Sequence, residues 1–300
     1  MLNLVQVQSF VAIIERGGFL EAARHLDVAQ PTVSQHLRKL EEQLGVALVQ
    51  RTRGGIAPTA RGAIFLPFAR RLIKGAERSI QAMGDLPLAV SASSNPGIYL
   101  IPPLASAFRG RSSKRSDIQL LLGSNPESLA RLESGEADMA VLESWDGRSG
   151  FEATVWRNER LVVIVSPDHA WSSRTSVRAI ELKGQPIIGG ESGSGTGRAL
   201  REALGPIANQ LRMVQQLGST DAVKKAVTAS LGISIVMEAC VAAEISNGTL
   251  HAVEIEDANL AKQIYIVLPA ETPPNTEARK FTSFLMDGPS QGSNLANTAL

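Results

Sequence analysis

The stretch that decides the fold is GFLEAARHLDVAQPTVSQHLRKLEEQL, residues 18–44, which predicts two short helices joined by a tight turn. We expect the second helix to begin at Pro31, because proline has no N–H to leave unpaired and its φ is preset for a first helical turn. Val33, Leu37 and Leu40 then recur at helical spacing and form an apolar stripe, which leaves the polar side chains between them facing solvent. Such a helix suits a DNA major groove, where amide, hydroxyl and guanidinium groups bond to base edges. An ordinary helical hairpin is the alternative that this pattern alone leaves open.

The segment that follows these helices is basic. It reads VALVQRTRGGIAPTARGAIFL, residues 46–66, with Arg51, Arg53 and Arg61 around a Gly-Gly turn. This composition is typical of a wing beside a helix-turn-helix, where guanidinium groups bind backbone phosphates. The net charge supports this interpretation, since residues 1–84 carry +5 and the remainder −4. A basic end of this kind is expected where one part of a chain approaches a polyanion.

Composition narrows the class of protein. The 300 residues are enough for two or three compact units, and no apolar run is long enough to cross a membrane. The first ten residues lack the pattern of a secretion signal, and the single cysteine, Cys240, excludes an intramolecular disulfide. We therefore expect a soluble cytoplasmic protein. The four histidines show no metal-ligand spacing and no catalytic constellation is visible, so we expect neither a bound metal nor an enzyme.

Residues 1–66 resemble the amino-terminal domain of LysR-type transcriptional regulators. The residues that carry the resemblance are in register without gaps: Phe10, Gly18-Phe19, Ala22-Ala23, Leu26, Ala29-Gln30-Pro31-Thr32-Val33-Ser34, Leu37, Leu40-Glu41, Leu44-Gly45, Leu48, Arg51, Pro58-Thr59 and Gly62. The resemblance implies a winged helix-turn-helix DNA-binding domain over residues 1–58. The side chains expected to enter the major groove are Gln30, Pro31, Thr32, Ser34, Gln35 and Arg38. Arg51, Arg53 and Arg61 are expected to hold phosphates of double-stranded DNA.

Residues 59–87 predict a long linker helix followed by a hinge. Phe65, Ala69, Leu72, Ala76 and Met83 lie near a 3.5-residue spacing, and a helix with such a stripe needs a partner surface. Pairing between two chains is preferred, because a homodimer brings two recognition helices to an imperfectly palindromic operator; packing against the chain's own domain is the alternative. The family resemblance further implies a homotetramer, and RNA polymerase as a partner if the protein is an activator.

From residue 88 to residue 286 strands and helices alternate, which predicts parallel α/β sheets. The expected strands are Leu88–Ser93, Ile118–Gly123, Ala137–Leu142, Arg160–Ser166, Pro186–Gly190, Gly232–Met237 and Gln263–Leu268. We expect one lobe at about 88–165 with 266–286, a second at about 166–265, and a flexible tail over 287–300. The resemblance continues through SGEADMAVL (134–142) and GSTDAVKKAVTASLGISIV (218–236), and implies an effector domain similar to two-lobed periplasmic binding proteins. The whole chain is thus expected to be an α+β multidomain protein.

Hydroxyl and amide side chains gather in four loops that follow strands or precede helices in this second part. Capping of helix ends explains any one of these loops, but ligands in open α/β sheets bind beyond the carboxyl ends of strands. Because helix N-termini offer free N–H groups there, we expect a small organic or inorganic anion as the effector and no other cofactor. The residues expected to bind it are Ser93, Ser94, Asn125, Ser192, Ser194, Thr196, Ser219 and Thr220. The family often has an arginine directly after this threonine, whereas Gly197 stands before Arg198 here.

The function that these patterns predict is an effector-controlled, sequence-specific transcriptional regulator. A solute-binding protein for transport would explain the two lobes but needs export, and an enzyme on an α/β scaffold needs catalytic residues. Both alternatives leave residues 18–66 without a role.

Overall fold

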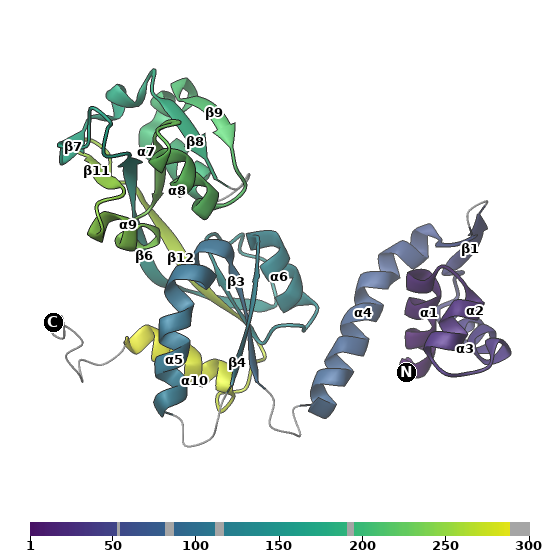
Figure 1. Cartoon of the computed structure of the whole chain (residues 1–300). Coiled ribbons are helices and arrows are strands. Elements are labelled where there is room, and N and C mark those ends of the chain that lie inside the picture. The colour runs from purple at the N-terminus through teal and green to yellow at the C-terminus, as the bar shows by residue number, and fades with distance from the viewer. Residues whose placement is uncertain (53–54, 82–86, 112–116, 191–194, 289–300) are drawn as a thin grey trace. The chain divides into compact units, whose positions relative to one another are not determined.

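The computed structural model of this chain describes residues 1–52, 55–81, 87–111, 117–190 and 195–288 (Figure 1). The chain divides into two compact units with the main boundary between Leu86 and Pro87.

The first unit is a bundle of helices with a short hairpin. Its elements are α1 (Leu4–Arg16), α2 (Phe19–His25), α3 (Gln30–Leu44), β1 (Val49–Thr52), β2 (Gly55–Pro58) and α4 (Ala60–Gln81). The core forms around Phe10, whose ring lies 5.7 Å from that of Phe65 on α4. Glycines at positive φ end α1 and α3, at Gly17 (φ 75°) and Gly45 (φ 70°), where a side chain would be strained. The helix-turn-helix predicted for 18–44 is confirmed, although α3 begins at Gln30, one residue before Pro31.

Helix α4 uses one apolar face inside its own unit and leaves another exposed. Phe65, Ala69 and Ile73 pack on the core of the first unit. Ile64, Phe68 and Leu72 are exposed by 58, 53 and 41%. The predicted apolar residues of α4 therefore lie on two faces of the helix, one packed on the core of the first unit and one exposed. Packing on the chain's own domain accounts for only one of these faces.

In the second unit, lobe I is built on a five-stranded layer. Strands β3 (Leu88–Ser93), β4 (Ile118–Gly123) and β5 (Met139–Leu142) run parallel, while β12 (Ala261–Pro269) is antiparallel to β5 and to β6 (Phe151–Val165). The order is β4-β3-β5-β12-β6. A π-helical turn (Pro96–Leu100) and the helices α5 (Ile101–Arg111), α6 (Asn125–Glu133) and α10 (Glu277–Asp287) complete the lobe.

Lobe II lies between β6 and β12 in the sequence. The end of β6 pairs with β10 (Ser234–Met237) and β11 (His251–Ile255), and β11 pairs with β7 (Ser176–Val177). A separate parallel pair joins β8 (Pro186–Gly189) to β9 (Arg212–Gln216). The helices are α7 (Gly195–Leu204), α8 (Thr220–Thr228) and α9 (Ala242–Ser246). One apolar core runs through both lobes, from Val90 and Phe281 to Ile187 and Ile233.

Two expectations about the second unit need correction. The sheets are mixed rather than parallel, because β6 carries the chain out of lobe I and β12 carries it back, so the two run in opposite directions (Figure 1). The chain also leaves lobe I earlier than residue 165. Residues up to Arg160 pair with β12, whereas Leu161 to Ile164 pair with β10. The apolar run 161–165 belongs by its pairing to lobe II.

Candidate functional site

Helix α3 presents the polar row that the sequence predicts. Val33, Leu37 and Leu40 are buried by the rest of the first unit, which fixes the rotation of the helix. The opposite face is open to solvent. Gln30, Pro31, Ser34, Gln35 and Arg38 are exposed there and Thr32 is half-buried.

The guanidinium group of Arg38 is held but not buried. Its Nε lies 2.8 Å from Glu42 Oε1 one turn later, and the two side chains are 81 and 59% exposed. Exposed pairs at this spacing are worth about 0.3–0.5 kcal/mol. The pair therefore orients the Arg38 side chain, but it is weak enough for the guanidinium group to bind another partner instead.

The wing is attached to α3 through Glu41. Its Oε1 accepts hydrogen bonds from the backbone N–H of Leu48 (2.7 Å) and of Val49 (3.3 Å), at the start of β1. On the other side of the hairpin the hydroxyl of Thr59 donates to Ala47 O (2.7 Å). Glu41 is one of the residues that carry the family resemblance. Its role in fixing the position of the wing could not be predicted, because its two hydrogen-bond partners lie seven and eight residues later, beyond the end of α3.

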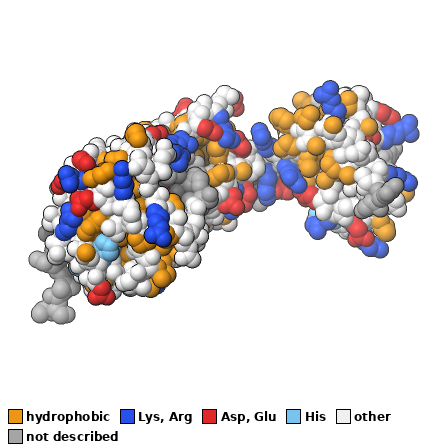
Figure 2. All heavy atoms as spheres, turned by 90° about the horizontal axis from the view of Figure 1, so that it is seen from above, with side chains coloured by type: hydrophobic (Ala, Val, Ile, Leu, Met, Phe, Trp, Pro, Cys, Tyr) orange, Lys and Arg blue, Asp and Glu red, His pale blue; other side chains and the backbone are white. Residues whose placement is uncertain are grey.

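The root of the wing also depends on Gly62 in α4. A Cβ at this position would lie 1.9 Å from Leu48 O, so only glycine lets the helix approach the strand this closely. Arg51 and Arg61 are exposed on either side of this contact. Arg53 lies outside the described residues. On the face of the first unit that Figure 2 shows, at the right of the view, Lys and Arg side chains lie at several separate places.

One cavity of the second unit has a volume of about 610 Å³ and opens in lobe II beside a loop of lobe I. Ser94 and Asn95 line it from lobe I. Its floor is apolar and includes Ile187, Val223 and Ile235. The predicted residues that the structure brings to this cavity are Ser94, Thr196, Ser219 and Thr220. Ser192 and Ser194, which precede α7, lie outside the described residues.

The charge of this cavity comes from two arginines that sequence reasoning did not select. Arg198 and Arg201 line it from α7, and its described lining contains no Asp or Glu. The first turns of α7 and α8 also face it, through Thr196 and Thr220. Helix N-termini and guanidinium groups both favour negative charge. The spacing of Arg198 and Arg201 on a predicted helix was visible in the sequence, but nothing there showed which way the helix faces.

Ser93 and Asn125 do not reach the cavity, contrary to the prediction. The buried hydroxyl of Ser93 donates to Val141 O (3.2 Å) and accepts from the backbone N–H of Glu143 (3.2 Å). Asn125 Oδ1 accepts from the same N–H (2.9 Å). Both side chains therefore hold the loop after β5, and their polar atoms are used within lobe I.

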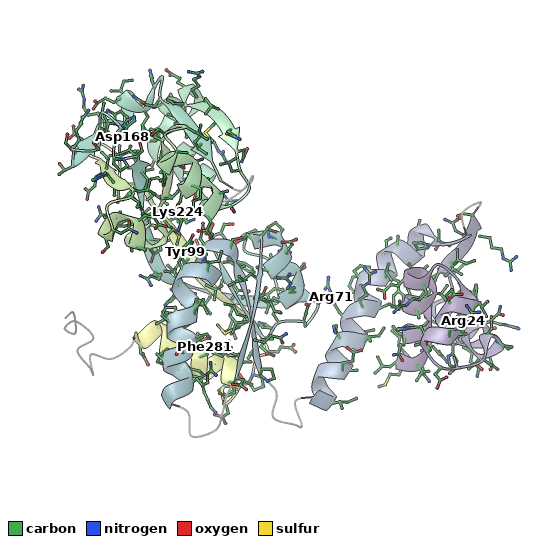
Figure 3. All side chains as sticks on the ribbon, viewed as in Figure 1. Arg24, Arg71, Tyr99, Asp168, Lys224 and Phe281 are labelled. Atoms are coloured by element: carbon green, nitrogen blue, oxygen red, sulfur yellow. The ribbon has the colours of Figure 1, made fainter. Side chains whose placement is uncertain are left out.

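The two lobes contact each other at the rim of the cavity. The hydroxyl of Thr220 donates to Asn95 Oδ1 (2.7 Å), and the hydroxyl of Tyr99 donates to Asp221 Oδ1 (2.7 Å). Burial, together with this bond to Asp221, raises the pKa of Tyr99, while the pKa of Asp221 is lowered by the same bond and by Lys224. Lys224 Nζ also lies 4.8 Å from the centre of the Tyr99 ring. Both residues are labelled in Figure 3.

Metal sites, membrane-spanning helices and the single cysteine bear on what other functions are open to the residues that the structure describes. No group of three or more His, Cys, Asp or Glu side chains among them could hold a metal ion. None of the described helices combines the length and apolar character that a membrane span requires. Cys240 is buried, and burial raises the pKa of its thiol.

Comparison with known proteins places both units in one family. Residues 4–63 match the family model described as "Bacterial regulatory helix-turn-helix protein, lysR family", and residues 85–289 match "LysR substrate binding domain". The putative regulator PtxE of Stutzerimonas stutzeri is 44% identical over 196 residues, which are 65% of this chain and all of that protein. The transcriptional activator CmpR of Synechocystis is 29% identical over 94% of each chain.

Solved structures agree on the fold. CbnR in complex with its target DNA superposes with a TM-score of 0.68 at 23% identity, over 94% of this chain and 98% of that one. The regulatory domain of CcmR from Synechocystis, in complex with 2-PG, gives 0.60 at 21% identity, over 67% of this chain and 95% of that one. An exposed polar helix beside a wing, a two-lobed domain with a cavity and these matches lead to one conclusion. This chain belongs to the LysR family of transcriptional regulators.

Proposed function

We propose that this regulator binds double-stranded DNA through α3 and the wing, and that a small anion in the lobe II cavity controls it. The observation that carries the proposal is the pairing of an exposed polar helix in one unit with a cavity lined by two arginines and no described acid in the other. In this proposal the protein acts in the cytoplasm as a regulator rather than as an enzyme. It meets RNA polymerase if it is an activator.

On α3, Gln35 and Arg38 would read base edges and Arg51 would hold a phosphate. A good base contact discriminates by about 1–3 kcal/mol, whereas a phosphate contact weakens binding to all sequences alike. The test is DNA affinity by mobility shift, on a selected site and on that site with single base changes. We expect Gln35→Ala to lose discrimination at one position and Arg51→Ala to lose affinity uniformly with a smaller salt slope. Lys39→Ala, exposed on the same helix, is the matched control, and identical profiles for all three variants would contradict these roles.

The cavity is proposed to bind a carboxylate, phosphate or similar anion between Arg198, Arg201 and the first turns of α7 and α8. The CcmR regulatory domain, of the same fold, was solved with 2-PG, which supports a ligand at a domain of this kind. Calorimetry with sodium phosphate, sodium acetate and 2-PG, against glycerol and ethanolamine, tests the charge preference. We expect Arg198→Ala to weaken binding of the preferred anion at least tenfold, while Arg212→Ala, outside the cavity lining, leaves it unchanged. Preference for the neutral or cationic compound would defeat the proposal.

We further propose that the exposed face of α4 joins two chains, as a dimer and then as a tetramer on an imperfectly palindromic operator. Phe68 and Leu72 lie on this face, and a helix face of this kind buries its apolar surface against a partner. Phe68→Glu is expected to shift the protein to monomers in analytical ultracentrifugation. Phe68→Leu keeps the face apolar and serves as the control. A Phe68→Glu protein that sediments as wild type would contradict this interface.

A further inference from the structure

A buried ion pair contacts Thr196, a residue of the wall of this cavity. Lys262 on β12 has a side chain that is only 3% exposed, and its Nζ lies 3.0 Å from Oε2 of Glu143, which is 6% exposed. The same Nζ donates a hydrogen bond to the hydroxyl of Thr196 (3.3 Å), a residue of the cavity wall in lobe II. Removing two charges from water costs several kcal/mol per ion, so a pair at this place needs a reason beyond stability.

The pair is not optimised for stability. Oε1 of Glu143 is buried and has no hydrogen-bond partner in the described structure. A carboxylate that is satisfied on one oxygen only gives less stabilisation than a fully bonded one. What the arrangement does provide is a connection between elements that are far apart in the sequence.

A second contact joins the same elements. A Cβ at Gly195, the first residue of α7, would lie 2.8 Å from the backbone oxygen of Glu143, so the start of α7 packs directly on this loop of lobe I. The loop itself is fixed, because Ser93 and Asn125 both accept the N–H of Glu143. A continuous series of contacts thus runs from lobe I through Glu143 and Lys262 to the wall of the cavity.

We propose that Lys262 and Glu143 form a tether that holds the first turn of α7 against lobe I. In this arrangement Lys262 is a positioning residue. It sets where Thr196 and the following Arg198 stand in the cavity, so that lobe I determines the geometry of the anion site in lobe II. The regulatory meaning of the tether rests on the proposed function, since it requires that the cavity be the effector site.

The test separates positioning from the cost of an unpaired buried charge. Amide hydrogen exchange of the full chain, without ligand, is compared for wild type, Lys262→Met, Lys262→Arg and the double variant Glu143→Gln with Lys262→Met. The double variant leaves neither Glu143 nor Lys262 as an unpaired buried charge, and Glu159 keeps its ion pair with Arg157, so the unfolding midpoint should return toward that of wild type. We expect exchange of residues 195–200 to stay at least tenfold faster in it, and Lys262→Arg to restore slow exchange.

The control is the exposed pair Glu277 and Lys280 on α10, changed to Gln and Met. Its exchange in 195–200 should equal that of wild type. If the double variant recovers slow exchange there together with its stability, or if exchange rises evenly across residues 87–288, the pair is only structural and the tether is refuted. Because no ligand is present, this result is independent of the Arg198→Ala calorimetry, which tests the proposed function itself.

Discussion

The most direct test of the wing's attachment is Glu41→Ala. The substitution removes the acceptor for two backbone N–H groups, and one of them belongs to Leu48, whose side chain is 1% exposed. A hydrogen bond to a charged group contributes about 1.5–3 kcal/mol, and an N–H left unsatisfied in a buried place costs about 1–3 kcal/mol. Since Glu41 is half-buried and the second bond is long, we expect a loss of about 2 kcal/mol.

For a domain of this size 1 kcal/mol shifts the unfolding midpoint by about 4–8 °C, so the first unit should unfold roughly 8–16 °C lower. All the Trp and Tyr residues lie beyond residue 87, so fluorescence follows only the second unit. Circular dichroism and calorimetry of the full chain follow both. The expected result is a lower calorimetric transition for the first unit with an unchanged fluorescence transition.

The matched control for Glu41→Ala is Glu42→Ala, next in sequence and exposed. Its pair with Arg38 is worth about 0.3–0.5 kcal/mol, so its midpoint should move by only about 1–4 °C. Below the transition, Glu41→Ala should also weaken DNA binding at all sequences alike, because a displaced wing loses phosphate contacts rather than base contacts. Equal midpoints for the two alanine variants would refute the claim that Glu41 holds the wing.

For two further substitutions, the structure predicts whether the protein becomes more or less stable. Gly62→Ala should destabilise the first unit by about 3 kcal/mol in chemical denaturation, because the added Cβ meets the backbone oxygen of Leu48. Gly75→Ala is the control: it has open space around it on the same helix and should stabilise the unit by about 0.5–1 kcal/mol. Destabilisation by both substitutions would contradict the packing argument. The side chain of Arg174, together with the backbone N–H of Arg178, lowers the pKa of Glu181 from 4.5 to about 2, so the stabilisation by Glu181 is present above pH 4.5 and lost as the pH falls through about 2. Glu181→Gln should therefore be less stable than wild type at pH 7, and the difference should vanish near pH 2; a difference that does not change with pH would rule out this ion pair as its source.

Local patterns predicted strands that are marked by a continuous run of mostly apolar residues. The expected strands Leu88–Ser93 and Ile118–Gly123 have the observed bounds of β3 and β4. Strand β9 was missed because its sequence, RMVQQ, is polar at three of five positions and every residue of it is exposed. It pairs through its backbone only with β8, so no burial pattern marks it.

Local patterns also predicted the part of the candidate site that lies on a single helix. The polar row of α3 could be predicted from the apolar stripe, because in a helix the residues that face the core determine which residues face solvent. The cavity depends instead on how lobes separated in sequence meet. Ser93 and Asn125 have the residue types of a ligand site, yet their polar atoms bond to the loop after β5. Arg198 and Arg201 became candidates only when the orientation of α7 was known.

The pairing of β6 with β12 has a consequence for how the polypeptide assembles. Arg160 and Ala261 are opposite each other, and the N–H of Leu161 donates to Leu260 O (2.8 Å). Topologically the two strands are a hairpin whose connecting loop is an entire lobe. Closing a flexible loop of this length would cost about 4 kcal/mol of chain entropy. A lobe II that folds first brings its own ends side by side and removes that cost. Strand β12, which is synthesised later, then takes its place between β5 and β6 and completes lobe I together with α10.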